Sequence, residues 1–115
     1  MVNVATLNEK VLSELRELLA DNFNELINRY ITDSKTRFDV LQQAVAELDF
    51  KTIYFEAHGI KGSSRNMGAD FLAEILGKIE DLGYAQNTHD LLSLFEQAQT
   101  EYVRVVEGLG RFRAA

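Results

Sequence analysis

Residues 22–48 read NFNELINRYITDSKTRFDVLQQAVAEL, a stretch without proline or glycine. Its apolar residues recur close to every 3.6 positions, which predicts one long amphipathic helix. At about 1.5 Å per residue, such a helix would be roughly 40 Å long. The whole chain lacks proline, a residue that long helices exclude from their interiors, so the sequence favours an all-α fold. The predicted inward stripe of this helix consists of Phe23, Ile27, Tyr30, Ser34, Leu41, Val45 and Leu48.

A shorter helix is predicted before this stretch and a third helix after it. Thr6 and Glu9 have the spacing of a capping box, and the helix that they begin is expected to end near Asp21. Asp49 is a suitable N-cap for a third helix that begins at Phe50. The inward residues are predicted to be Val11, Leu12, Leu15, Leu18 and Leu19 in the first helix, and Ile53, Ala57, Ile60, Ser64 and Met67 in the third.

Two further helices are predicted in the remainder of the chain. The fourth is expected to close at Gly83, in the position where a left-handed residue is favoured. Asn87 or Thr88 is expected to cap the fifth, and Gly108 with Gly110 to mark its end, leaving the last five residues loose. The inward residues are predicted to be Leu72, Ile75, Leu76, Ile79 and Leu82 in the fourth helix, and Leu91, Phe95, Ala98, Tyr102, Val105 and Leu109 in the fifth.

The connections between the later helices are short, which favours antiparallel neighbours. We therefore expect an antiparallel four-helix bundle with an additional short N-terminal helix. A length of 115 residues and a hydrophobic content of 46% suit one core, so residues 1–115 are expected to form a single helical domain.

The composition excludes several classes of function. The chain has no cysteine, which rules out disulfides, thiolate metal sites and cysteine nucleophiles. Its formal charge of -6 has the wrong sign for a protein that neutralises nucleic-acid phosphates. No stretch is apolar over the length needed to cross a bilayer, and the first residues do not resemble a secretion signal. We expect a soluble, cytoplasmic protein with neither a nucleic-acid nor a membrane partner.

The third predicted helix carries the segment HGIKGSSRNMGA at residues 58–69. Glycine inside a helix costs on the order of 1 kcal/mol relative to alanine, so two glycines within one turn need a reason. At 100° per residue, one face of this helix turns away from the predicted core. That face presents Phe55, His58, Lys61, Gly62 and Arg65.

These residues suit phosphoryl transfer. An exposed imidazole, with an intrinsic pKa of roughly 6.5, is mostly uncharged at neutral pH and can act as a nucleophile or phosphoryl acceptor. Lys61 can offset the negative charge of a phosphoryl group, and Gly62 leaves room for a second macromolecule beside His58. Because the sequence has no nucleotide-binding motif and no carboxylate cluster at the histidine, nucleotide and metal would have to sit on another molecule.

A plainer interpretation of the same residues also holds. A lone surface histidine is more often solvated than catalytic, and close helix packing or a kink also explains glycines in a helix. Gly59 has no assigned role. His89 is more simply explained by solvation or capping, and it is too far from His58 in sequence to suggest a metal site, so we predict none. Glu80 and the leucine stripes are assigned to structure.

The segment resembles the motif of histidine-containing phosphotransfer (HPt) domains. That motif is a histidine, any residue, leucine, lysine, glycine, two small residues, a spacer, an apolar residue, glycine and alanine. Ile60 in place of leucine is the one departure, at an inward position. Asp49 near the start of the third helix, and the pair Ile79 and Glu80 before a glycine, extend the likeness over the whole predicted bundle.

The resemblance implies that His58 accepts a phosphoryl group from the aspartyl phosphate of one receiver domain and passes it to the aspartate of another. These would be the receivers of a hybrid sensor kinase and of a response regulator. It further implies that Lys61 supports the phosphohistidine and that Gly62 gives access to it. The chain would have no ATP-dependent kinase activity and no cofactor of its own, since the Mg²⁺ belongs to the receiver. We expect it to act as a monomer and a free-standing shuttle.

Five residues are candidate contacts for a receiver. Two belong to the face around His58: Arg65, whose charge suits a receiver's carboxylates, and Phe55, which is either an exposed apolar anchor for the partner or partly buried against the second helix. The others lie off the main stripe of the long second helix, and geometry alone suggests them: Ile31, Lys35 and Phe38.

Two other classes of function are weighed against this one. A non-catalytic helical adaptor has no need of Gly62 beside an exposed histidine. A bundle that holds a metal or haem would place its ligands on the inward stripes, where no histidine falls. The adaptor is the alternative. The sequence does not identify the cognate kinase, the regulator or the direction of phosphoryl flow.

Overall fold

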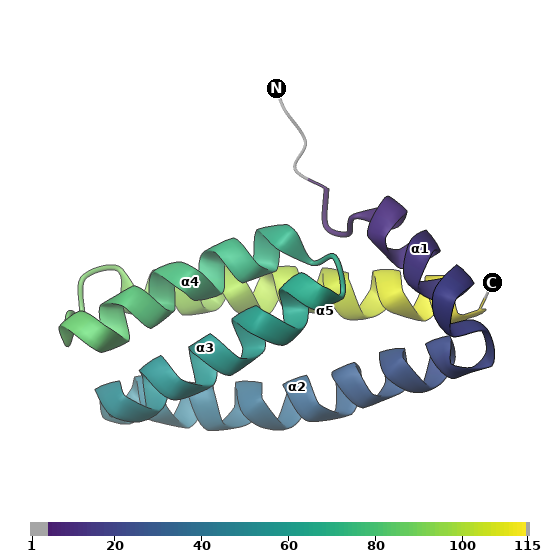
Figure 1. Ribbon diagram of the computed structural model, residues 1–115. Coiled ribbons are helices and arrows are strands. Elements are labelled where there is room, and N and C mark those ends of the chain that lie inside the picture. Colours follow the sequence, from purple (N-terminus) through teal and green to yellow (C-terminus); the bar gives the residue numbers. More distant parts are fainter. Residues whose placement is uncertain (1–4, 115) are drawn as a thin grey trace.

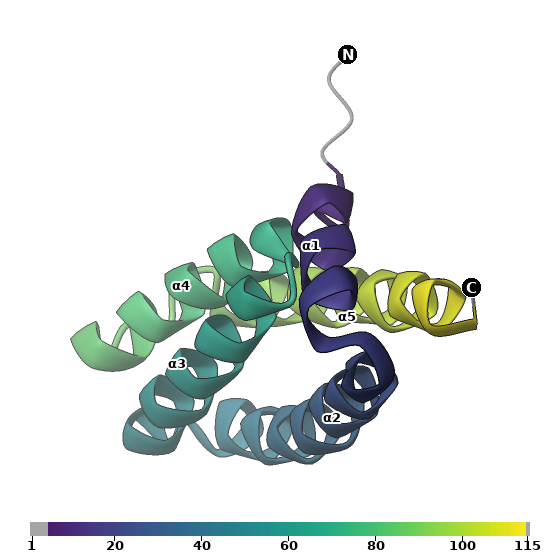
Figure 2. The same ribbon diagram turned by 45° about the vertical axis from the view of Figure 1, so that its right-hand side comes forward.

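The computed structural model describes residues 5–114 and confirms the all-α fold. Four long helices form an antiparallel bundle, and a short helix packs across the end where the bundle's first helix begins and its last helix ends (Figures 1 and 2). The elements are α1 (Glu9–Leu19), the short 3-10 helix η1 (Ala20–Asn22), α2 (Phe23–Glu47), α3 (Phe50–Asn66), α4 (Asp70–Ala85) and α5 (Leu91–Ala114).

The predicted inward stripes form most of the core. On α3, all five predicted residues are at most 2% exposed. On α4 and α5 the predicted residues are buried except Leu82 and Tyr102, which are partly exposed and pack against the core. Leu18, in the last turn of α1, and Leu48, the C-cap of α2, are exposed instead.

Two pairs of hydroxyl groups cross the core and fix α2 against its neighbours. The hydroxyls of Tyr30 and Ser64 are 2.7 Å apart, and so are those of Ser34 and Tyr102. Burial raises the pKa of Tyr30, so this phenol stays protonated. Because a buried hydroxyl without a partner costs about 1–3 kcal/mol, the pairs favour one register of α2 against α3 and α5.

Local side-chain caps decide where α1 and α3 begin. Asp49 caps α3 as predicted, and its side chain accepts a hydrogen bond from the backbone N–H of Thr52 at 3.3 Å. The predicted capping box at the start of α1 is wrong. Asn8 caps that helix, with its Oδ1 accepting from the N–H of Val11 at 3.3 Å, while its backbone N–H donates to the carbonyl of Gly68 at 2.8 Å.

The predicted end of α4 at Gly83 is also wrong. The helix continues to Ala85, and Gln86 adopts the left-handed conformation with φ 53°. Gly83 is buried where α4 meets α3, and an added Cβ would lie 2.8 Å from the backbone nitrogen of Tyr54. This glycine therefore serves the close approach of two helices rather than a helix end.

The last helix differs from the prediction at both ends. It begins at Leu91, and the Asn87 side chain accepts from the backbone N–H of His89 instead of capping the helix. It passes through both glycines to Ala114, so residues 111–114 of the expected loose tail are helical, and Ala115 lies outside the described residues. Phe112 explains this extension: its ring packs edge-on against Phe23 at 6.4 Å, and the Arg16 guanidinium lies 4.8 Å above it.

A second contact on α5 involves Gly108. A Cβ added at this glycine would lie 2.6 Å from the side chain of Leu7, so the glycine makes room for that leucine.

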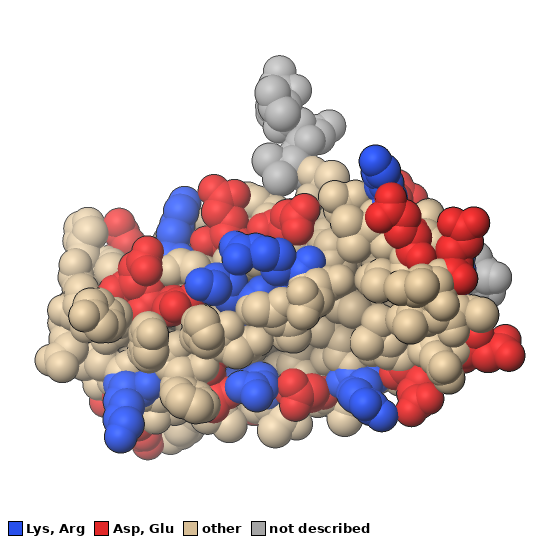
Figure 3. Space-filling view, viewed as in Figure 1, with Lys and Arg blue, Asp and Glu red and all other residues tan. Residues whose placement is uncertain are grey.

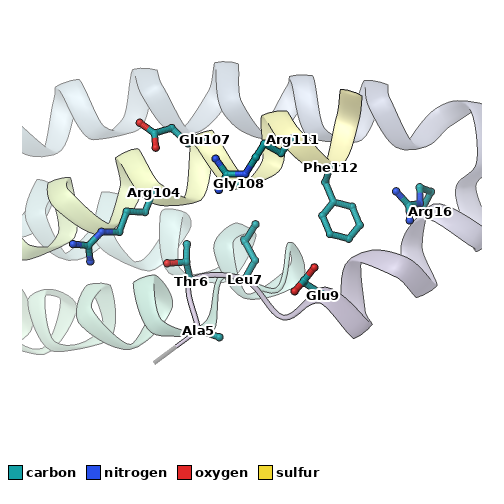
Figure 4. Close-up of a pocket in the computed structure, with 10 residues that line it drawn as sticks. All are labelled: Ala5, Thr6, Leu7, Glu9, Arg16, Arg104, Glu107, Gly108, Arg111 and Phe112. Carbon is teal, nitrogen blue, oxygen red and sulfur yellow. The ribbon is translucent and has the colours of Figure 1, made fainter. Parts of the chain in front are cut away.

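Between residues 5–9 and α5 is an open hollow of about 770 Å³ (Figure 4). Its lining contains none of the residues predicted for phosphoryl transfer: it consists of Ala5, Thr6, Leu7, Glu9, Arg16, Arg104, Glu107, Gly108, Arg111 and Phe112.

The contact at Gly83 predicts opposite effects for two glycine substitutions. Gly83→Ala should lower the free energy of unfolding by about 1–3 kcal/mol, because the methyl group forces α3 and α4 apart. Gly110→Ala, at a position with no heavy atom within 4 Å of the added Cβ, should raise it by about 0.5–1 kcal/mol. Urea unfolding followed by circular dichroism measures both. A Gly83→Ala protein as stable as wild type would contradict the role given to this contact.

Candidate functional site

The outer face of α3 presents the predicted site. Phe55, His58, Gly62 and Arg65 are exposed along it, and the His58 side chain is 63% exposed. Lys61 is partly buried, because its side chain leans towards α4. Figure 3 shows this side of the molecule, where Lys and Arg side chains gather in the middle of the face with acidic side chains next to them.

Glu80 of α4 joins two polar residues of the predicted site, His58 and Lys61. Its Oε2 lies 3.0 Å from Nδ1 of His58, and its Oε1 lies 2.6 Å from Nζ of Lys61. One carboxylate thus contacts both side chains, and only 12% of the Glu80 side chain is exposed. The prediction from sequence assigned Glu80 to structure alone and missed this arrangement.

The charge state of Glu80 follows from its surroundings. Burial acts to raise its pKa, but the hydrogen bonds and charges of Lys61 and His58 outweigh burial and hold the pKa below its usual value. Glu80 is therefore anionic at neutral pH. Its negative charge lies between an ammonium group and an imidazole ring.

The Glu80 contact fixes the imidazole tautomer. An ionised carboxylate only accepts hydrogen bonds, so Nδ1 of His58 donates to it. In the neutral ring the other nitrogen, Nε2, then carries the free lone pair. The site thus presents an exposed histidine whose Nδ1 faces Glu80 and whose Nε2, in the neutral ring, carries the free lone pair.

The glycines of α3 and α4 have separable roles around this site. No heavy atom lies within 4 Å of a Cβ added at Gly62, so the surface next to His58 is open. Gly77 of α4 lies beneath the Lys61 stem, with 3.6 Å between an added Cβ and Lys61 Cδ.

Gly59, which had no explanation from sequence, makes room for a side chain of α2. An added Cβ there would collide with the guanidinium of Arg37. Arg37 forms ion pairs with Asp33 of α2 and Glu56 of α3, each at 3.2 Å. The absence of a side chain at Gly59 therefore lets an ion pair bridge α2 and α3 next to the candidate site.

The predicted partner contacts divide into exposed and covered residues. Lys35 is exposed like Phe55 and Arg65, whereas Ile31 is only partly exposed. Phe38 is 6% exposed, and its ring lies 4.3 Å from that of Tyr102. Its prediction as a partner contact is wrong, because α2 packs against α5 as well as α3 and buries a wider face than its main stripe.

The two residues missed at the site are Glu80 and Tyr54. Gly77 and Gly83 mark the side of α4 that approaches α3, and Glu80 lies three residues from each, which is a signal in the sequence that could have found it. Tyr54 precedes His58 by one turn. Its ring centroid is 6.2 Å from that of the imidazole, with 21° between the planes.

Two further findings concern the described residues as a whole. Within residues 5–114, no three His, Cys, Asp or Glu side chains come together in a way that could hold a metal ion. None of the helices formed by these residues combines the length and apolar character needed to span a membrane.

Comparison with known proteins agrees with the geometry. Residues 25–112 match the Hpt domain family. The fold is similar to the crystal structure of histidine-containing phosphotransfer protein B from Pseudomonas aeruginosa PAO1, with a TM-score of 0.92 and 28% sequence identity over 97% of each chain. No curated protein matched the sequence significantly. The chain therefore belongs to the Hpt domain family, with the role in histidine phosphotransfer that this family has in phosphorelays.

Proposed function

We propose that His58 is the residue phosphorylated. It would accept the phosphoryl group from the aspartyl phosphate of one receiver domain, that of a hybrid sensor kinase, and pass it to the aspartate of a second, that of a response regulator. The observation that carries the proposal is the hydrogen bond of Nδ1 to Glu80 at 3.0 Å on an otherwise exposed ring. This bond leaves Nε2 as the nucleophile.

The transfer forms one bond and breaks one. The Nε2 lone pair attacks phosphorus, the bond between phosphorus and the aspartyl oxygen breaks, and the aspartate leaves as a carboxylate. The product ring keeps its proton on Nδ1 and carries a positive charge, which the adjacent Glu80 carboxylate offsets. In the second transfer a receiver carboxylate attacks phosphorus, the bond to Nε2 breaks, and the neutral imidazole is restored.

Lys61 and Gly62 support this exchange in different ways. A phosphoryl group brings a charge of about −1.5 to −2 at neutral pH, and the Lys61 ammonium is the cation that Glu80 holds beside the ring. Gly62 leaves the space that a receiver must enter, since no heavy atom lies within 4 Å of an added Cβ. We assign Lys61 to charge compensation and Gly62 to access.

The remaining requirements of the reaction fall to the partner. We expect the magnesium ion to belong to the receiver, so the chain would need no cofactor of its own and no ATP-dependent kinase activity. Each transfer needs one carrier and one receiver, and we therefore propose that the chain acts as a monomer. We also propose that it acts in the cytoplasm.

The first prediction of the proposed function tests which residue is phosphorylated. Incubation with phosphorylated receiver domains should label the wild-type protein with an acid-labile phosphoryl group, and His58→Gln should abolish labelling while leaving the helical circular dichroism unchanged. Because His89 is also exposed, His89→Gln is the matched control and should be labelled like wild type. Label on the His58→Gln protein, or none on wild type across a panel of receivers, would refute the proposal.

The second prediction tests Glu80. Glu80→Ala should slow transfer to His58 by about tenfold, equivalent to about 1.4 kcal/mol, because the ring loses the partner that sets its tautomer. The rates are compared at neutral pH, where Glu80, with its lowered pKa, is ionised.

Glu74, an exposed acidic residue of the same helix, provides the control for this measurement. Glu74→Ala changes the net charge equally and should transfer at the wild-type rate. Equal rates for the two variants would leave Glu80 with a structural role only.

The third prediction tests access at Gly62. Gly62→Leu should fold normally, because the position is open and leucine is a good helix former, yet it should slow transfer by tenfold or more (about 1.4 kcal/mol or more). Gly110→Leu, at a second open position but on α5, should leave the rate unchanged. Single-turnover transfer from a phosphorylated receiver measures both. A Gly62→Leu protein that transfers at the wild-type rate would contradict the assignment.

A further inference from the structure

Three large aromatic side chains are exposed at one end of the candidate site. Tyr54 and Phe55 lie on α3, one turn before His58, and are 38% and 68% exposed. Tyr84 lies near the end of α4 and is 80% exposed. The rings of Tyr54 and Tyr84 are 6.0 Å apart, and that of Tyr54 is nearly parallel to the imidazole. We call these three residues the aromatic patch.

The contact at Gly83 keeps the patch on the surface. An added Cβ at Gly83 would lie 2.8 Å from the Tyr54 nitrogen, so no space remains between the two helices for a ring. Tyr54 forms this contact through its backbone, and Tyr84 follows Gly83 in sequence. The rings of both residues consequently lie outside the helix interface. Their exposure is therefore a fixed property of the way α3 and α4 pack, and exposed aromatic groups in a cluster mark interaction surfaces.

The distances place the patch inside the area that a docked partner must cover. Centroid distances of 6.2 and 6.0 Å put the Tyr84 ring no further than their total, about 12 Å, from the imidazole. A standard interface buries about 800 Å² on each partner, which corresponds to a disc of roughly 16 Å radius. A receiver centred on His58 would therefore cover the patch.

We propose that the aromatic patch is the surface through which this chain binds receiver domains, an inference that rests on the proposed function. The partner is a receiver that carries apolar side chains beside its phosphorylated aspartate. Its acidic site would face His58 and the neighbouring cations Lys61 and Arg65, while its apolar side chains would cover the three rings. Figure 3 shows Lys and Arg side chains gathered on this face with acidic side chains next to them, and the three exposed rings supply the apolar contacts.

The α2 side of α3 offers less apolar surface. Phe38 is buried and Ile31 is partly covered, and the Arg37 side chain, with its ion pairs, covers Gly59 between the two helices. The apolar contacts for a receiver therefore lie on α3 and α4, at Tyr54, Phe55 and Tyr84, instead of at Ile31 and Phe38 of α2. Of these three residues, only Phe55 was expected from the sequence.

The test measures binding separately from chemistry. Calorimetry would titrate a receiver domain, held in its phosphorylated-like state by magnesium and beryllofluoride, into wild-type protein and into Tyr54→Ala and Tyr84→Ala. The receiver is the one that transfers fastest to wild type. Each substitution should raise Kd by about tenfold, because each removes a tyrosine ring that the docked receiver would cover, and Tyr84→Phe should restore most of the affinity.

Two exposed residues elsewhere provide matched controls. Leu18→Ala on α1 and Val103→Ala on α5 remove apolar side chains that are 79% and 54% exposed, and both should bind like wild type. Circular dichroism would verify that every variant is folded.

Three results would overturn the proposal. Wild-type Kd values for both tyrosine variants, with transfer to His58 intact, would refute the docking surface and leave the proposed function standing. A dimer of the protein alone that Tyr84→Ala dissociates, seen by sedimentation, would assign the patch to a second copy. Failure of every receiver to transfer to wild type would refute the proposed function and, with it, this inference.

Discussion

The close packing of α3 and α4 is the constraint on which the site depends. With Gly83 in contact with the Tyr54 backbone, the two helices approach too closely for a side chain to intervene. One turn back along α4, Glu80 therefore lies within hydrogen-bonding distance of His58 and Lys61 on α3. A wider spacing would leave the imidazole without a fixed tautomer and the ammonium group without a partner, although every residue of the α3 motif would still be present.

The site is consequently a property of two helices, although one helix carries the recognisable motif. The α3 segment supplies the histidine proposed as nucleophile, a cation and open space at Gly62, and α4 supplies the carboxylate that contacts both polar side chains. Glu80 has two oxygens and uses both. This division explains how a chain with few polar groups at its site can present a histidine in one tautomer on an exposed surface, where water would otherwise compete for both ring nitrogens.

Features that depend on local patterns could be predicted from sequence, and features that depend on neighbours could not. The inward stripe of α3 and its Asp49 cap follow from helical spacing and a short-range hydrogen bond. Gly83 and Gly108 were expected to mark helix ends, but a glycine also permits close packing, and only the neighbouring element distinguishes the two. Phe38 lies off the single inward stripe predicted for α2, which led to its prediction as a surface contact. In the structure α2 packs against both α3 and α5, so a wider face of it is buried. For the same reason, Gly77 and Gly83 indicate the side of α4 on which Glu80 lies, but its partners on α3 could not be derived from α4 alone.

The hydroxyl pairs in the core have a consequence for the dynamics of signalling. Ser64 lies six residues after His58 on the same helix, and its bond to Tyr30 ties that helix to α2 at a buried point. Rotating or sliding α3 would break this bond and expose the core. If His58 is the phosphorylated residue, as proposed, it therefore sits on a preorganised helix, and docking of a partner would cost the carrier little conformational entropy. Such a carrier would accept and donate with the same rigid surface, and the relative free energies of the phosphorylated partners would set the direction of flow.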